Sequence, residues 1–208
     1  MARTPDAARR SETSRQAVLA ATAAICAESG YQRLTIEAIA ARAGVGKMTI
    51  YRWWPSKGAI VLDLLDQAAA VGIDPPDTGD LAADLRSLLV EVIDILTPLD
   101  SSPAIGLLAE SLHDCALSRQ VHERLIRPRI ATFEQRLRRA QEVGQLPPDV
   151  DLAVALDLLY GPIYHRLAVH LDMPDDDHLD ALVAHTLRAL GASDTAAPPS
   201  SKDPAAPA

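Results

Sequence analysis

The chain has 208 residues, of which 48% are apolar and only 3% aromatic. A core built mainly from Ala, Leu, Val and Ile favours close-packed helices over a β-sandwich. No stretch approaches the roughly 18 consecutive apolar residues of a membrane span, and the N-terminus lacks the apolar segment of a secretory signal. Cys26 and Cys115 stand in helical patterns rather than at disulfide-framework spacings. We therefore expect a cytoplasmic, all-α protein.

The net charge of −8 is distributed unevenly. Residues 1–62 carry nine Lys and Arg against four Asp and Glu, whereas the rest of the chain carries eleven against twenty-four. A basic end on an acidic body is typical of a protein that meets phosphates through that end alone.

The N-terminal helices are short and closely spaced. Helical periodicity and breaker residues predict helices over residues 12–29, 35–43, 46–53 and 56–70. Thr35 is placed to N-cap the second helix, and Ser56 the fourth. Gly44 ends the second helix, and Pro55 stops the third.

Longer helices follow the loop at residues 72–80, which is the best candidate for a domain boundary. They are predicted over residues 81–96, 104–113, 117–143, 151–171 and 175–190, about nine helices in the whole chain. Pro128 should kink its helix, and Gly161-Pro162 should interrupt the next one.

This pattern predicts four segments along the chain. They are a flexible arm (1–11), a helix-turn-helix domain (12–58), a second helical domain (59–191) and a disordered tail (192–208).

The second and third helices, joined by a tight turn at Gly44, are typical of a helix-turn-helix. Glycine supplies the positive φ that such a turn needs. Val45 and Ile50 anchor the third helix, so its polar and aromatic side chains point outward. A helix of this width fits the DNA major groove.

The stretch from residue 18 to 57 reads VLAATAAICAESGYQRLTIEAIAARAGVGKMTIYRWWPSK and resembles the DNA-binding domain of TetR-type repressors. The matching features are the Ala20-Ala21 pair, the Glu28–Tyr31 turn, the helix begun by Thr35, the Gly44-Val45 turn, the Thr49–Tyr51 core and Pro55–Lys57.

The resemblance implies a role for particular side chains. Thr35, Tyr51 and Lys57 match phosphate contacts, and Lys47, Met48 and Thr49 match positions that face the bases. The predicted DNA-binding residues are Thr35, Lys47, Met48, Thr49, Tyr51, Arg52, Trp53 and Lys57.

The sequence departs from the family pattern in two places. Gly46 stands where Ser or Thr often caps the recognition helix. Trp53-Trp54 replaces a His-Phe or Tyr-Phe pair, so we expect one tryptophan in the core and the other against the phosphate backbone.

Residues 151–169 resemble a late helix of a TetR subgroup less sharply. The resemblance implies that residues 59–191 form a ligand-binding and dimerisation domain, with a homodimer through the last two helices and a pocket for a small hydrophobic effector. Candidate lining residues are Leu108, Leu112, Phe133, Leu156, Tyr160 and Tyr164, for which core packing or the dimer seam is an equally open interpretation.

The sequence therefore predicts a repressor that binds a palindromic operator as a dimer and is released by its effector, although an activator stays open. We expect no enzyme, cofactor or metal site, since catalytic motifs are missing and His165 and His170 lie about 140° apart on a helix. The alternative is a ligand-binding helical protein or enzyme with a vestigial helix-turn-helix.

The arginines between residues 124 and 139 are interpreted first as a solvated face, and next as partners of acidic helices.

Overall fold

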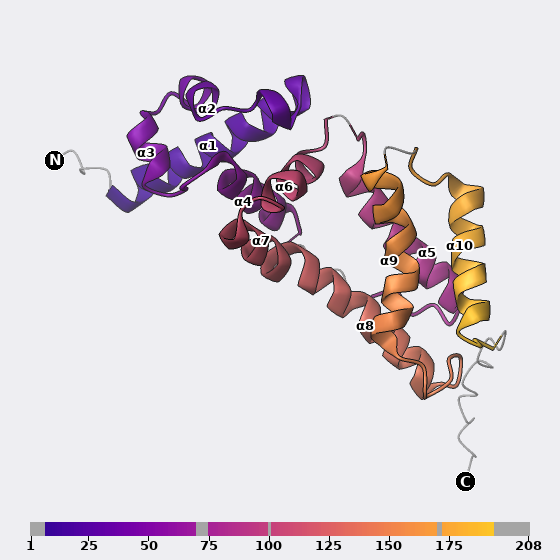
Figure 1. The fold of residues 1–208 in the computed structure, drawn as a ribbon. Helices are drawn as coiled ribbons and strands as arrows, with labels where there is room; N and C mark the ends of the chain where they lie inside the picture. The colour runs from indigo at the N-terminus through magenta and orange to yellow at the C-terminus, as the bar shows by residue number, and fades with distance from the viewer. Residues whose placement is uncertain (1–6, 70–74, 100, 170–171, 194–208) are drawn as a thin grey trace, which may run out of the picture. The chain divides into compact units, whose positions relative to one another are not determined.

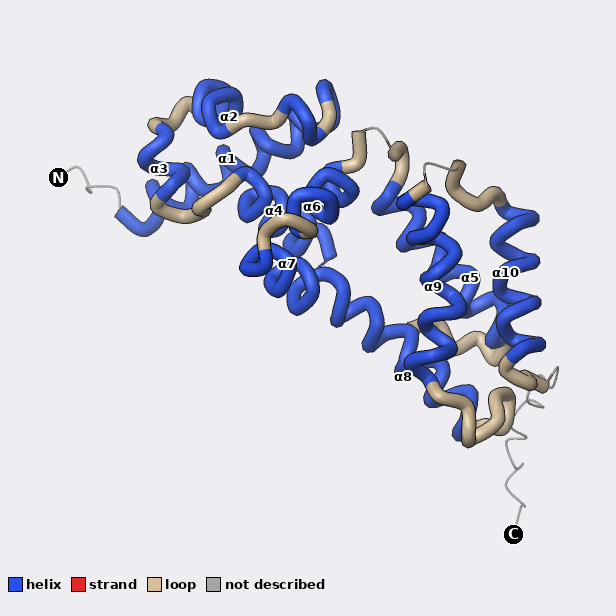
Figure 2. The backbone as a smooth tube through the Cα atoms, viewed as in Figure 1, coloured by secondary structure: helices blue, strands red, loops and turns tan. Residues whose placement is uncertain are grey.

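The computed structural model describes residues 7–69, 75–99, 101–169 and 172–193. Every regular element within these residues is helical, as the composition predicts (Figure 1, Figure 2). The α-helices are α1 (Ala7–Ser29), α2 (Ile36–Ala43), α3 (Lys47–Tyr51), α4 (Lys57–Ala69), α5 (Leu81–Leu96), α6 (Pro103–Ser111), α7 (Cys115–Val121), α8 (Arg127–Glu142), α9 (Leu152–Ala168) and α10 (Asp176–Ala189).

Two short non-α turns complete the described elements. One is the 3-10 turn η1 (Tyr31–Arg33), and the other is the π-helical turn η2 (His122–Ile126) between α7 and α8. Because α7, η2 and α8 follow one another without a break, they correspond to the single kinked helix predicted for residues 117–143. The predicted all-α architecture is confirmed.

The π-turn has a cause in the sequence. Pro128, at the start of α8, has no N–H with which to bond the carbonyl of Arg124 four residues earlier. A helix accommodates such a gap by locally widening into i→i+5 bonding. The irregularity expected at Pro128 therefore lies in the turn that precedes it.

The chain divides into two compact units. Unit 1 comprises residues 1–73 and 91–130, and unit 2 comprises residues 74–90 and 131–208. The divisions fall inside α5 and α8, so neither unit is a single continuous segment.

The core of unit 1 is aliphatic and continuous. Ile39 of α2, Ile50 of α3 and Ile60 of α4 are fully buried in it, together with Leu107 of α6. The short helices of the N-terminal region therefore share one core with α6, rather than packing only among themselves.

Two predicted boundaries differ from the structure. α1 begins at Ala7 rather than at residue 12, because the Ala- and Arg-rich residues before Ser11 have high helix propensity although they lack apolar periodicity. α9 runs unbroken through Gly161-Pro162, so the expected interruption is wrong. A proline inside a helix removes one backbone bond, and the packing of the helix can offset that loss. Residues 1–6 of the predicted arm and 194–208 of the predicted tail lie outside the described residues.

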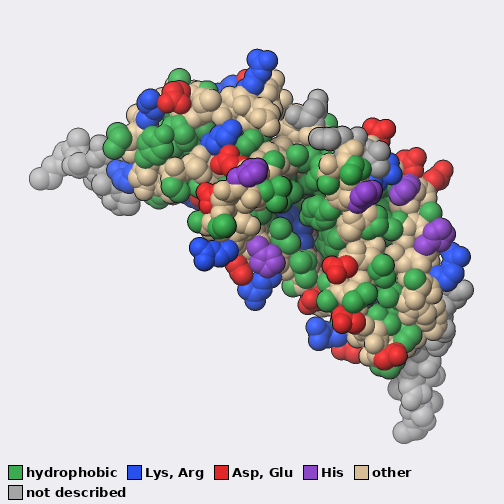
Figure 3. All heavy atoms as spheres, in the orientation of Figure 1, with side chains coloured by type: hydrophobic (Ala, Val, Ile, Leu, Met, Phe, Trp, Pro, Cys, Tyr) green, Lys and Arg blue, Asp and Glu red, His purple; other side chains and the backbone are tan. Residues whose placement is uncertain are grey.

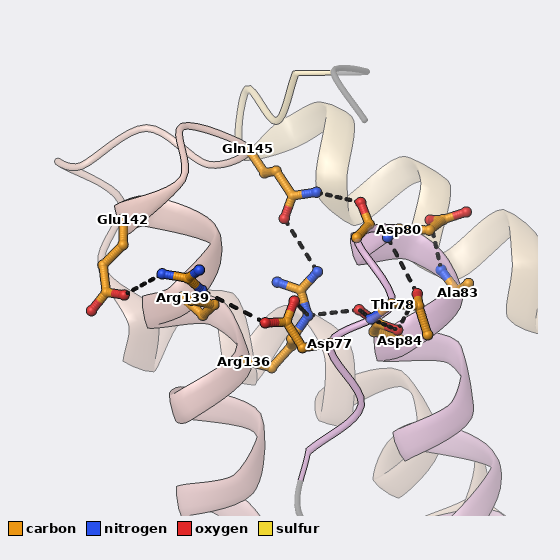
Figure 4. A network of polar contacts seen from close by, with 10 residues as sticks. Asp77, Thr78, Asp80, Ala83, Asp84, Arg136, Arg139, Glu142 and Gln145 are labelled. Atoms are coloured by element: carbon orange, nitrogen blue, oxygen red, sulfur yellow. Dashed lines mark hydrogen bonds and ion pairs between the residues drawn. The ribbon is translucent and has the colours of Figure 1, made fainter. Parts of the chain in front are cut away.

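Unit 2 is braced by a buried arginine on α8 (Figure 4). Arg136 Nε donates to Asp84 Oδ2 of α5 at 2.7 Å, and Arg136 Nη2 donates to Gln145 Oε1 at 3.2 Å. Asp84 also accepts hydrogen bonds from the backbone and hydroxyl of Thr78. For Arg136 the first interpretation, a solvated face, is wrong, and the second, pairing with an acidic helix, is right.

Candidate nucleic-acid interface

The turn between α2 and α3 has the backbone that a helix-turn-helix requires. Gly44 ends α2 in the left-handed region, at φ 66° and ψ 30°. Thr35 begins the same helix as its N-cap, and its side chain accepts a hydrogen bond from the Ala38 N–H. Gly46 precedes α3 without a side-chain cap, as expected from the missing hydroxyl.

The outward side of α3 exposes large side chains. Met48 is 81% exposed, and Tyr51 and Trp53 are 49% and 40% exposed. Ile50, on the inward side, is completely buried. Figure 3 shows hydrophobic side chains with Lys and Arg among them at the surface of the part of unit 1 that holds α2 and α3.

The charged side chains of this surface are already engaged. Lys47 Nζ lies 2.9 Å from Glu37 Oε1 of α2, and both side chains are more than half exposed. The hydrogen bond to Glu37 raises the pKa of Lys47 and so keeps it protonated. The Arg52 guanidinium lies over the Trp53 ring, 5.9 Å from its centroid.

The two tryptophans have different environments. Trp54 is buried, and its Nε1 donates to Asp63 Oδ2 of α4 at 2.9 Å. Trp53 remains at the surface, with its ring centroid 6.2 Å from that of Trp54. One ring thus belongs to the core of unit 1, and the other extends the exposed surface of α3.

The remaining predicted DNA-binding residues lie at the start of α2, within α3 and at the start of α4. Thr35 is exposed, and Thr49 is half-buried. Lys57, the first residue of α4, is half-buried, and its Nζ lies 4.4 Å from the centroid of the Tyr31 ring.

Asp63 lies at the centre of a polar network that was not predicted from the sequence. It accepts from Trp54, from Arg15 of α1 at 3.1 Å and from Arg124 of η2 at 2.7 Å. Burial by itself raises the pKa of Asp63, but the three hydrogen bonds outweigh it and lower the pKa below its usual value. A carboxylate inside the apolar run of residues 59–65 was the signal for such a site, because a buried charge needs partners.

The six candidate effector residues do not fall in one unit. Leu108, which packs against the core of unit 1, and Leu112, which is 83% exposed, lie in unit 1. Phe133, Leu156, Tyr160 and Tyr164 lie in unit 2.

Three of the unit 2 candidates form an aromatic group. The ring centroids of Phe133 and Tyr160 lie 4.9 Å apart, and those of Tyr160 and Tyr164 lie 6.3 Å apart. Leu156 is buried one turn before Tyr160 on α9.

A pocket of about 250 Å³ lies elsewhere, in unit 1. Its lining comes from α1, α4 and the connection between α5 and α6, and comprises Ala23, Cys26, Ala27, Leu64, Thr97, Pro98, Ser101, Ser102 and Pro103. Cys26 is buried there, and burial raises the pKa of its thiol, which disfavours the reactive thiolate. None of the six candidates lines this pocket.

Other kinds of site receive no support from the described part of the chain. No group of three or more His, Cys, Asp or Glu in it could hold a metal ion. No helix in the same residues has both the length and the apolar character that a membrane span requires.

Family models match both halves of the chain. Residues 18–64 match the model described as bacterial regulatory proteins of the tetR family, and residues 75–186 match a tetracyclin repressor-like C-terminal domain.

Similar proteins match this chain along most of their own length. An HTH-type transcriptional regulator YdeS of Bacillus subtilis, itself uncharacterised, is 29% identical over 88% of this chain and 93% of its own. A DNA-binding transcriptional repressor TetR of Mycobacteroides abscessus is 30% identical over 87% of this chain and 95% of its own. The crystal structure of the TetR family transcription regulator SCO0332 shares 37% identity, covers 84% of this chain and 97% of its own, and superposes with a TM-score of 0.67.

The geometry of residues 35–57 and these matches lead to the same conclusion. A left-handed glycine turn, an N-capped α2 and an exposed α3 are what a DNA-reading helix-turn-helix needs. The chain belongs to the TetR family of DNA-binding transcriptional regulators.

Proposed function

We propose that this regulator is a repressor that binds a palindromic operator as a homodimer and is released by a small hydrophobic effector. The exposed side of α3 carries the DNA-binding part of the proposal. Met48 and Tyr51 expose apolar and aromatic surface beside Lys47, an arrangement that an ordinary solvated helix has no reason to keep. The M. abscessus relative is named a repressor, which supports repression over activation.

The exposed side chains of α3 have different tasks. Lys47, Met48 and Thr49, at the start of the helix, would face base edges in the major groove. Thr35, Tyr51 and Lys57 would contact phosphates, which fix the register on the duplex without reading its sequence. Arg52 and Trp53 would extend the backbone contact at the end of the helix.

The ion pair between Lys47 and Glu37 would open on binding. Both side chains are exposed, so the pair contributes little to stability. Exchanging Glu37 for a base or phosphate oxygen therefore costs little.

Dimerisation would use α9 and α10. Val154 and Leu158 are large apolar residues that remain exposed along α9, as does Val169 directly after it. Gly161 offers open space where a second helix could approach. At helical spacing Val154, Leu158 and Gly161 share one face. A two-fold dimer would place its recognition helices about 34–36 Å apart, one turn of DNA.

The effector would contact the aromatic group of unit 2. Phe133, Tyr160 and Tyr164, with Leu156, offer an apolar surface with few polar groups, which favours binding by burial of a hydrophobic ligand. A ligand shifts the DNA-binding equilibrium only if it prefers one conformer over the other.

A gel-shift titration against the DNA upstream of the protein's own gene tests the operator proposal. Binding should weaken steeply with salt. Tyr51→Phe and Lys57→Gln should weaken it about evenly across sequences, whereas Lys47→Ala and Thr49→Ala should change base preference. Arg138→Ala, exposed on α8, is the matched control. Unchanged binding in all four variants would overturn the docking surface.

Light scattering on the purified protein tests the dimer. Leu158→Asp should convert dimer to monomer, because it buries a charge in an apolar interface. Leu112→Asp, which changes an equally large but more exposed leucine just after α6, should leave the dimer intact. Dimers that persist in the Leu158 variant would exclude this face.

The fluorescent probe 1-anilinonaphthalene-8-sulfonate tests the effector surface. Its fluorescence should rise on binding the wild-type protein, and the rise should be smaller in Tyr164→Asp. An equal rise in the two proteins would count against the aromatic group as the effector site.

A further inference from the structure

Tyr31 connects the DNA-binding helices to α6. It is the first residue of η1, separated from the end of α1 by Gly30, and is only 5% exposed. Its hydroxyl donates to Glu110 Oε2 of α6 at 2.6 Å. Burial, and next the bond to Glu110, raises the pKa of Tyr31, so the hydroxyl keeps its proton and remains a donor.

Glycines let α6 approach this closely. A Cβ atom at Gly106 of α6 would lie 2.1 Å from Cγ of Tyr31, far inside van der Waals contact. A Cβ atom at Gly58 of α4 would lie 2.7 Å from Glu110 Oε1. The Tyr31 ring therefore occupies space that only a glycine at position 106 leaves open, and the Glu110 carboxylate lies against Gly58 of α4.

The same tyrosine holds Lys57. The Lys57 ammonium lies over the face of the Tyr31 ring and also lies 3.5 Å from the Tyr31 backbone oxygen. A cation over an aromatic face is attracted to it most strongly when partly desolvated, and Lys57 is half-buried. The ammonium thus contacts Tyr31 through both the ring and the backbone oxygen.

We propose that Glu110 is a positioning residue for operator binding, because it fixes Tyr31 and thereby holds the Lys57 ammonium where it meets a phosphate. The inference rests on the proposed role of Lys57 as a phosphate contact. It assigns a role in DNA binding to α6, which belongs to the segment that matches the C-terminal family model. If α6 moved away from α4, Glu110 would move with it. That movement would change the position of the Tyr31 ring and so of the Lys57 ammonium.

A double-mutant cycle on operator affinity separates positioning from mere packing. In the wild-type background, Glu110→Ala should weaken operator binding roughly five- to tenfold, the effect of about one hydrogen bond. In the Lys57→Gln background the same change should weaken it less than about twofold, since the charge to be positioned is gone. Glu110→Gln, which retains an acceptor for Tyr31, should bind nearly as the wild type does.

Two further variants guard against a folding defect. Tyr31→Phe keeps the ring and its packing but removes the donor, so it should weaken binding as Glu110→Ala does. Glu123→Ala, which removes an exposed carboxylate of η2 paired with Arg127, is the control and should leave operator affinity unchanged.

Nuclear magnetic resonance of the lysine Cε atoms reports the position of Lys57 relative to the Tyr31 ring without DNA. The chain has three lysines, so the spectrum is simple, and the ring current of Tyr31 should displace the Lys57 signal. In Glu110→Ala that signal should move toward the position of an exposed lysine, and in Glu110→Gln it should not.

Three outcomes would overturn the inference. The first is an equal loss of affinity from Glu110→Ala with and without the Lys57 charge, and the second is a Lys57 signal that does not move. The third is unchanged affinity in Lys57→Gln alone, which removes the phosphate role itself. That third result contradicts the phosphate role proposed for Lys57, whereas the first two leave that role intact.

Discussion

Unit 1 and unit 2 are each braced by a network around one charged side chain, but the two networks are built in opposite ways. In unit 1 a carboxylate, Asp63, stands at the centre and receives donors from three other segments. In unit 2 a guanidinium, Arg136, stands at the centre, and its donors reach Asp84 and Gln145 (Figure 4). The Asp63 side chain is 17% exposed, whereas Arg136 and Asp84 are each 1% exposed.

This difference in exposure should determine how much stability each unit loses when one partner is substituted. A fully buried ion pair gains little over apolar residues, but removing one partner leaves an uncompensated charge in the interior. A partly exposed network lets water replace a lost partner, so each contact contributes less. Unit 2 should therefore be sensitive to a single change, whereas unit 1 should lose stability gradually.

The largest effect is expected from Arg136→Ala. It leaves the Asp84 carboxylate buried with only the Thr78 donors, so the free energy of unfolding should fall by about 3–5 kcal/mol. Urea denaturation followed by circular dichroism measures the change.

The double variant Asp84→Leu with Arg136→Met tests whether the unpaired charge is the cause of that loss. It replaces both charges with apolar groups, and it should recover most of the lost stability. If the double variant is as unstable as Arg136→Ala, the cost comes from lost packing rather than from the stranded charge.

A smaller, pH-dependent effect is expected from Asp63→Asn. The variant loses the charge that Arg15 and Arg124 face, so at neutral pH the free energy of unfolding should fall by about 1–3 kcal/mol. Because folding lowers the pKa of Asp63 below its ordinary value of 3.8, the wild-type carboxylate contributes its full stabilisation above that value.

The pH dependence supplies its own control. As the pH falls below about 4, Asp63 takes up a proton in the unfolded chain first, so its stabilisation begins to decline. The stabilisation is lost once the pH falls below the lowered pKa of the folded state, and the two proteins should then converge. Other carboxylates titrate equally in both, and the difference between their unfolding curves isolates Asp63. A difference that stays constant down to about pH 3 would show that the charge is not what matters.

The contrast between the networks also explains what could be predicted from the sequence. The helix-turn-helix was predictable because Thr35, Gly44 and the apolar spacing around Ile50 act locally, within a few residues of one another. Such signals depend on backbone preference and on helical period, and both can be read along the chain.

The polar networks depend on contacts between distant segments. Arg136 and Asp84 are separated by many residues, and nothing near Arg136 distinguishes it from exposed arginines on the same helix. Local clues existed only for the partners: Asp63 interrupts an apolar run, and Gly106 lies inside a helix, where glycine usually marks a close approach. The sequence therefore indicates where a special contact is needed, but not which residue completes it.

The smallest effect is expected from Arg127→Ala, which tests an ion pair that is more exposed than either network. Arg127 Nη1 lies 2.8 Å from Glu123 Oε2, a shorter distance than the one between Arg15 and Asp63, yet both side chains are more than half exposed. Pairs of this kind on a helix contribute no more than about 0.5 kcal/mol, and salt screens them. The urea midpoint should therefore move barely beyond error at low salt and not at all at high salt. A loss as large as that from Asp63→Asn would mean that pair distance, rather than burial, decides how these networks stabilise the protein.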